Sequence, residues 1–167
     1  ISAALLEVEE WGPAAGSTRF PQVGWRLAAF RTRPYAATER ALLQAALDHG
    51  GPRDLALLHT RLGEWFAVAA LELLAASGVE AEEVAAIGSH GQTLWHEPPG
   101  PGERGSSLQL GCPAAIAGGT GIGVVSDGRS RDLAAGGHGA PLVPWADRVL
   151  FSSPDRARAL QNLGGMG

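Results

Sequence analysis

Several features that would place this chain in a special class are scarce or missing. It has one cysteine, Cys112, among 167 residues, so no internal disulfide can form. The formal net charge of −4 gives no broad positive field, and the arginines are scattered, which argues against nucleic acid as a partner. The most apolar stretch, residues 67–79, contains Glu72 and is too short to cross a bilayer, and no signal peptide is visible. These absences, together with the lone cysteine, predict a cytoplasmic protein without membrane or nucleic-acid partners.

The apolar pattern at the start of the chain predicts strands followed by helices. Residues 1–9 and 25–32 favour two antiparallel strands, and residues 37–48 have a helical composition. Residues 54–76 carry apolar side chains at three- and four-residue spacing, which predicts a long helix with one face in the core. That stripe comprises Leu55, Leu58, Leu62, Trp65, Phe66, Ala69 and Leu73.

Strands and helices alternate in the rest of the chain. We predict strands at 84–88, 106–111 and 123–126, with a brief helix at 112–117. The glycines of 118–123 resemble a nucleotide-binding fingerprint, but a strand follows them rather than precedes them, so we predict a turn. The alternation indicates an α/β fold, a sheet with crossover helices, in which ligands gather at the carboxyl ends of strands.

Two polar segments follow predicted strands and are the candidate binding residues. The sequence GSHGQT supplies hydroxyl, imidazole and amide groups within five positions, and two glycines allow close approach of the backbone. The second segment, DGRSRD, precedes a glycine-rich stretch at 136–139. It could be only a solvated turn with local ion pairs, but the glycines favour a site, and both segments could face one pocket. The candidates are Ser89, His90, Gln92, Thr93, Asp127, Arg129 and Arg131, with Asp132 in the same cluster.

Other candidate sites are weaker. The set His90, His96, Cys112 and His138 matches none of the usual zinc-ligand spacings, so no metal site is predicted. Ser89 lacks the frame of a hydrolase nucleophile. We expect His49 at a helix end and His59 on a helix surface.

Three joined motifs carry a family resemblance. They are IGSHGQTLWHEP, LQLGCPAAIAGGTGIGVVSDGRSRDLAAGGHGAPLVP and NLGGMG, and they resemble the anhydro-N-acetylmuramic acid kinases of bacteria. The resemblance covers nearly the whole chain; it is strong from Ile87 onward and weak before Asp54. Cys112 stands where the family commonly has Asn or Asp before proline, which removes a good helix cap.

The resemblance implies an actin-like (ribonuclease H-like) sugar kinase of two lobes with ATP between them. Residues 1–158 would form the first lobe, lacking its first phosphate-binding hairpin, and residues 159–167 the truncated start of the second. We therefore expect the chain to be a piece of a longer protein, cut within structured elements, with ALQNLGGMG a strand that runs into a glycine turn.

The resemblance also implies the reaction and the roles of residues. The family opens the 1,6-anhydro ring by hydrolysis and phosphorylates the sugar, giving N-acetylmuramic acid 6-phosphate in cell-wall recycling, with ATP and Mg²⁺. The seven candidate residues above would line the sugar side of the cleft, and Gly164 and Gly165 would contact ATP. The expected general base lies beyond Gly167, so no catalytic residue is assigned in this chain.

Two rival functions stay open at this point. One is a non-catalytic sugar-binding or regulatory protein with an actin-like lobe. The other is a different acid-sugar or acetate kinase on the same fold. A homodimer is also left open.

Overall fold

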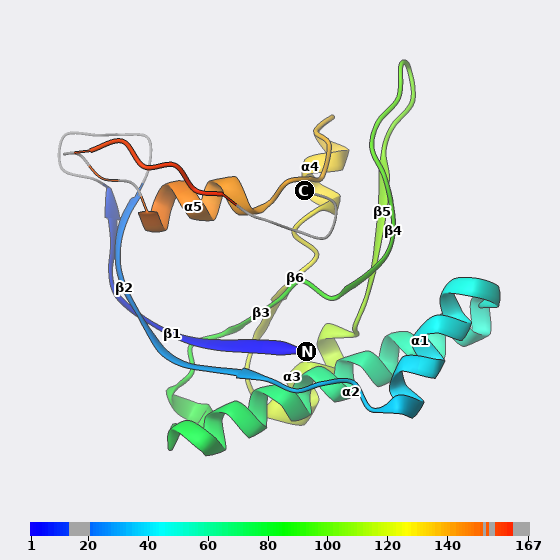
Figure 1. Cartoon of the computed structure of the whole chain (residues 1–167), viewed down its shortest axis with the longest axis horizontal. Coiled ribbons are helices and arrows are strands. Elements are labelled where there is room, and N and C mark those ends of the chain that lie inside the picture. The colour runs from blue at the N-terminus through cyan, green and yellow to red at the C-terminus, as the bar shows by residue number, and fades with distance from the viewer. Residues whose placement is uncertain (14–20, 152, 154–155, 162–167) are drawn as a thin grey trace. The chain divides into compact units, whose positions relative to one another are not determined.

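The computed structural model describes residues 1–13, 21–151, 153 and 156–161 (Figure 1). The chain divides into two units, one of residues 1–5 and 27–140 and the other of residues 6–26 and 141–167. The first unit mixes helices with short strands, so the predicted α/β class is confirmed. The predicted lobe boundary at residue 158 falls inside the second unit.

Two helices form the main support of the first unit. Helix α1 (Ala37–His49) and helix α2 (Pro52–Ser77) confirm both predicted helices to within two residues at each end. Proline suits the first turn of α2, where its missing N–H leaves no carbonyl unpaired. Gly78, at φ 69°, ends α2 in the left-handed conformation that glycine adopts without strain.

The core lies along α2. Leu58, Leu62, Ala69 and Leu73 are buried, and Leu62 is fully inaccessible, which confirms the predicted stripe. Leu55, Trp65 and Phe66 are only partly buried; the Trp65 ring instead packs edge-on against Tyr35, with centroids 6.1 Å apart. None of the helices in the described part of the chain has the length and apolar character that a membrane span requires.

Helix α3 (Pro113–Thr120) packs closely against α2. A Cβ on the buried Gly63 of α2 would lie 2.5 Å from the Cys112 carbonyl oxygen and 2.9 Å from the Ala115 Cβ, so only glycine fits there. Cys112 occupies the N-cap position and makes no side-chain cap bond, as expected. The predicted turn at 118–123 is wrong for its first three residues, because they complete α3; Gly121, at φ 74°, then ends the helix.

Strand β3 (Ile87–Ser89) pairs in parallel with β6 (Val124–Ser126). Helix α3 belongs to the crossover between them and contacts β6. The strand predicted at 84–88 starts later, because a 3₁₀ turn (Ala81–Glu83) comes first and β3 continues through Ser89. β6 is less buried than its apolar residues suggest, since Val125 is 67% exposed.

Strand β4 (Gln92–Glu97) pairs antiparallel with β5 (Ser106–Leu110), with an irregularity between Thr93 and Trp95. The two form a long, narrow hairpin (Figure 1). Gln92 and Thr93 therefore lie in a strand, and the prediction that they belong to a loop is wrong.

The remaining strands, β1 (Ser2–Pro13) and β2 (Pro21–Thr32), pair with each other and contribute to both units. They run further than predicted, since a two-stranded ribbon tolerates proline at its edges. The described strands thus form three separate pairs rather than one sheet. In the second unit, Trp25 of β2 packs edge-on against Phe151 of helix α5 (Val143–Phe151) and donates to the Leu150 carbonyl at 3.2 Å. Residues 159–161 form no strand, and residues 162–167 lie outside the described residues.

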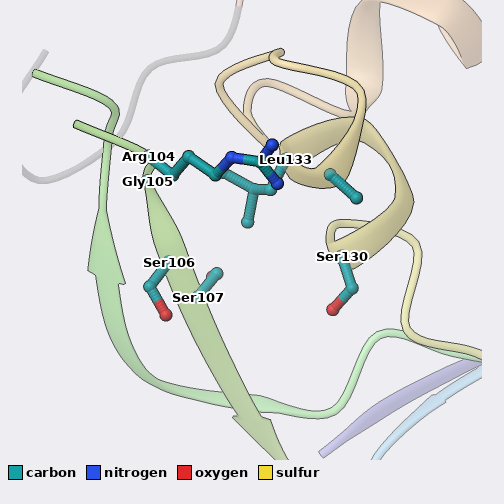
Figure 2. A pocket seen from close by; sticks show the side chains of 7 residues that line it. Arg104, Gly105, Ser106, Ser107, Ser130 and Leu133 are labelled. Atoms are coloured by element: carbon teal, nitrogen blue, oxygen red, sulfur yellow. The ribbon is translucent and has the colours of Figure 1, made fainter. Parts of the chain in front are cut away.

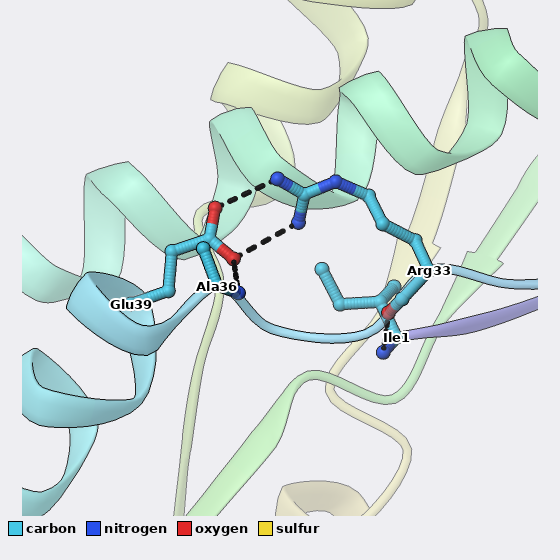
Figure 3. A network of polar contacts seen from close by, with 4 residues as sticks. All are labelled: Ile1, Arg33, Ala36 and Glu39. Carbon is cyan, nitrogen blue, oxygen red and sulfur yellow. Dashed lines mark hydrogen bonds and ion pairs between the residues drawn. The ribbon is translucent and has the colours of Figure 1, made fainter.

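A buried ion pair joins the end of β2 to the start of α1 (Figure 3). The Arg33 guanidinium donates to both Glu39 oxygens, at 2.7 and 3.1 Å, and the Ala36 N–H donates to Oε2 of Glu39 at 2.9 Å. These hydrogen bonds hold the pKa of Glu39 below its ordinary value, although burial opposes them. Glu39 therefore caps the first turn of α1 and is charged near neutral pH.

Candidate functional site

The two polar segments predicted from sequence leave the sheet at the same edge. Ser89 is paired with Ser126 in the parallel β3–β6 register, so the chain exits both strands side by side. Only His90 and Gly91 separate β3 from β4. The expectation that both segments lie at the carboxyl ends of neighbouring strands is confirmed.

Arg129 and His90 connect the two segments directly. Nε and Nη2 of Arg129 both donate to Nε2 of His90, at 3.1 and 2.7 Å. Because a guanidinium only donates, Nε2 must be the unprotonated acceptor. The proton then sits on Nδ1, which lies 3.0 Å from the Gly91 carbonyl oxygen and donates to it. The geometry thus fixes one neutral tautomer of His90.

The same arginine is also held from the glycine-rich stretch. Nη1 of Arg129 donates to the Gly139 carbonyl at 2.6 Å, and the Gly139 N–H donates to Oδ2 of Asp132 at 2.7 Å. Asp132 lies in the short helix α4 (Ser130–Ala134). Four residues, from the two polar segments and the glycine-rich stretch, thus form one continuous set of hydrogen bonds, which we call the His90–Arg129 network: His90, Arg129, Gly139 and Asp132.

Asp127 forms a turn at the end of β6. Its φ of 58° is the one positive value for a non-glycine residue in the described part of the chain. Oδ1 accepts hydrogen bonds from Ser130, from Oγ at 2.6 Å and from N at 3.4 Å. This is a local aspartate turn. The described contacts use only Oδ1, so Oδ2 faces no described partner.

The other predicted site residues lie outside this network. Ser89 ends β3, half-buried; the Gln92 amide donates to the Thr93 carbonyl at 3.4 Å, and the Thr93 hydroxyl accepts from Gln109 at 3.5 Å. Arg131 is exposed on α4, where its carbonyl accepts the Ala135 N–H at 3.1 Å; its side chain takes part in none of the described hydrogen bonds or ion pairs. Gly164 and Gly165 lie outside the described residues. A role in binding the substrate stays a prediction for all of these.

A hollow of about 250 Å³ lies between β5 and α4 (Figure 2). The guanidinium of Arg104 extends across it toward Leu133, and the Ser106 and Ser130 hydroxyls lie on opposite sides. Sequence reasoning missed this hollow, because Arg104 stands in a proline- and glycine-rich turn that looks like an ordinary hairpin end. The hollow is lined by Arg104, Gly105, Ser106, Ser107, Ser130, Leu133 and Ala134.

His59 lies on the surface of α2, as predicted, but it is half-buried and also bonds to the junction of β5 and α3. Its Nδ1 accepts the Gly111 N–H at 3.1 Å, and its carbonyl accepts the Cys112 N–H at 2.9 Å. These bonds fix the junction of β5 and α3 to the middle of α2. Nothing in the local sequence shows a contact over 52 positions.

Metal-ligand geometry is not assembled in the described part of the chain. No group of three or more His, Cys, Asp or Glu side chains there could hold a metal ion. The described side chains therefore offer hydrogen-bond donors and acceptors for a polar organic ligand, with arginine as the cation.

Comparison with known proteins adds the family. A family model described as anhydro-N-acetylmuramic acid kinase matches residues 21–167. Proteins of that name are similar to this chain: one from Gloeobacter violaceus is 41% identical over 169 residues, covering 99% of this chain and 42% of the relative. One from Caldanaerobacter subterraneus subsp. tengcongensis is 50% identical over 64% of this chain and 28% of the relative. A third, from Chromobacterium violaceum, is 44% identical over 80% and 35%.

This chain thus spans less than half the length of the curated relatives that it matches. The match of the family model extends over most of the chain and includes every residue of the His90–Arg129 network. The chain therefore belongs to the anhydro-N-acetylmuramic acid kinase family.

Proposed function

We propose that the protein is an ATP-dependent kinase that opens 1,6-anhydro-N-acetylmuramic acid by hydrolysis and phosphorylates it to N-acetylmuramic acid 6-phosphate. Family membership supports this activity. The structural observation that carries it is the joining of the β3 and β6 ends by Arg129 and His90, which gathers polar groups where α/β folds bind ligands. Residues 1–158 would be the first lobe of an actin-like fold, and residues 159–167 the start of the second.

The network suits the acidic sugar. Three of the five N–H groups of Arg129 are used by His90 and Gly139, so two remain for a ligand. A guanidinium with two donors on one side matches a carboxylate, such as the lactyl group of the substrate. We also assign Oδ2 of Asp127 and the Ser89 hydroxyl, which belong to the same sheet edge, to the sugar hydroxyls.

The proposed reaction needs residues of this chain to bind the sugar and residues beyond Gly167 to accept the proton from water. Water adds to the anomeric carbon, the bond from that carbon to O6 breaks, and O6 takes the phosphoryl group that ATP with Mg²⁺ supplies. We assign the described residues the binding and orientation of the sugar. The proton acceptor for water is expected beyond Gly167. A cytoplasmic location suits both ATP and a sugar recovered from the cell wall.

The test is ATP consumption by the full-length protein with the anhydro sugar, compared with N-acetylglucosamine and acetate. Of these three compounds, we expect only the anhydro sugar to support ATP consumption, and we expect a product with the mass of N-acetylmuramic acid 6-phosphate. Replacing Arg129 with Lys keeps the positive charge but removes the planar pair of N–H donors. This change should lower kcat/KM for the sugar roughly tenfold or more.

The matched control is Arg40→Lys, an exposed arginine on α1, which should stay within about twofold of the parent. Sugar binding without any ATP consumption would contradict the proposal and favour the non-catalytic alternative. Turnover with acetate in place of the anhydro sugar would favour the other kinase.

A further inference from the structure

Asp132 is not among the residues proposed to bind the sugar, but it is connected to one of them, Arg129, through Gly139. Its carboxylate accepts the Gly139 N–H at 2.7 Å, and the Gly139 carbonyl accepts Nη1 of Arg129 at 2.6 Å. Both polar backbone groups of Gly139 are therefore held by charged side chains. Such charge-assisted hydrogen bonds are about twice as strong as neutral ones.

The stretch around Gly139 is shaped to this contact. Gly139 is buried at φ 68°, and a Cβ there would lie 2.8 Å from Cγ of Leu133. A Cβ on Gly137 would overlap the Asp132 carboxylate. A side chain at either glycine would displace Leu133 or the Asp132 carboxylate, and the positive φ of Gly139 favours glycine there, so the contact between Asp132 and Gly139 depends on both glycines.

We propose that Asp132 is a positioning residue: through Gly139 it holds the Arg129 guanidinium on Nε2 of His90, with its two remaining N–H groups directed to the substrate. The identity of the substrate in this inference rests on the proposed function, whereas the hydrogen bonds between Asp132, Gly139, Arg129 and His90 do not depend on it. This arrangement also gives His90 a role. Because two donors of Arg129 meet Nε2 of His90, the imidazole orients the arginine.

The experiment replaces Asp132 in the full-length protein with Ala, which removes the acceptor, and with Asn, which keeps an acceptor oxygen. We expect Asp132→Ala to raise KM for the anhydro sugar roughly tenfold, the effect of one hydrogen bond to a charged group, with kcat within about threefold. Asp132→Asn should restore most of the affinity. The control Asp48→Ala removes an exposed carboxylate of α1 that accepts from Gln44 at 2.9 Å, and should leave KM unchanged.

A second readout does not depend on turnover. Ring ¹⁵N shifts of His90, assigned by comparison with His90→Gln, should show a protonated Nδ1 and an unprotonated Nε2 in the parent. In Asp132→Ala the chemical shifts of the two ring nitrogens should change toward the averaged values of a free imidazole. In Asp132→Asn these shifts should stay near those of the parent.

The outcomes separate the two proposals. If the parent shows no turnover with the anhydro sugar, the proposed function fails, while the His90 shifts still decide the role of Asp132. If folded Asp132→Ala keeps the parent His90 shifts and KM, or changes only the unfolding temperature, Asp132 is merely structural and the inference is overturned. If Asp132→Ala does not fold, Asp132→Leu takes its place, because it keeps a branched side chain of similar size without an acceptor oxygen. Parent-like His90 shifts and KM in the folded Leu variant would likewise overturn the inference.

Discussion

At the scale of single residues, the Arg33–Glu39 pair shows how one carboxylate supports both an ion pair and a helix start. Glu39 is 8% exposed, and its pKa is lowered chiefly by the hydrogen bonds from Arg33, with help from the Ala36 N–H. A lowered folded-state pKa means that ionised Glu39 stabilises the fold above the unfolded-state pKa. That contribution is lost as the pH falls through the lower, folded-state pKa.

We expect Glu39→Gln to reduce the free energy of unfolding by about 1.5–3 kcal/mol at pH 7, since it weakens hydrogen bonds to a charged partner. The deficit should shrink as the pH falls below the ordinary carboxyl pKa of 4.5, because the parent then loses the same charge. Urea unfolding of the full-length protein at several pH values measures this.

Glu7→Gln is the matched control, because Glu7 pairs with Arg26 on the surface with a side chain 51% exposed. Its effect should stay below about 1 kcal/mol. Equal losses in the two variants, or a Glu39→Gln deficit that does not depend on pH, would mean that the buried pair contributes no more than a surface pair.

At the scale of elements, α2 carries the stability of the first unit. Leu62 is fully buried in contact with the core cluster, whereas Leu57 on the same helix is 44% exposed. We expect Leu62→Ala to lower the free energy of unfolding by about 2–5 kcal/mol and Leu57→Ala by less than about 1 kcal/mol. Denaturant melts of both variants measure it; similar losses would show that the two faces of α2 are equally covered in the full-length protein.

The two long helices were predictable from this sequence to within two residues, because their signal is local; α3 was predicted three residues too short, and α4 and α5 were not predicted. The three- and four-residue spacing of Leu58, Leu62 and Ala69 depends only on the helix itself. β3 was predicted with wrong boundaries and β4 was not predicted, because a strand of three to six residues depends on its partner. Gln92 and Thr93 are polar enough for a loop, but pairing with β5 makes them a strand.

The location of the candidate site was predictable from the sequence, but most of its side-chain contacts were not. Strand ends identified His90 and Arg129, and the structure brings them together across 39 positions. Asp127 was expected to project toward a ligand, yet the same short side chain can close a turn with Ser130, and it does. Arg104 was missed because the residues across the hollow come from α4, and the bond from Gly111 to His59 was missed because it joins positions 52 apart.

At the scale of the whole molecule, buried side chains are distributed unevenly. Of the described residues, those buried in the apolar core belong to the first unit except Val149 of α5. Local opening requires less free energy where less apolar surface is buried. We expect amide hydrogens of α2 around Leu62 to exchange at least roughly tenfold more slowly than those of α5 in the full-length protein. Hydrogen exchange followed by mass spectrometry measures this, and equal protection would mean that α5 gains further burial from residues beyond those described.

Gly63 has a consequence for protein engineering. Replacing a glycine in the middle of a helix with alanine is a standard way to stabilise a protein, and is worth about 1 kcal/mol of helix propensity. At Gly63 the added methyl group would strike the Cys112 carbonyl and the Ala115 side chain, so α2 and α3 would have to separate. Such a separation would also pull on the β5–α3 junction that His59 holds. A thermostabilisation library for this enzyme family should therefore leave position 63 unchanged and place its helix substitutions on the exposed face of α2.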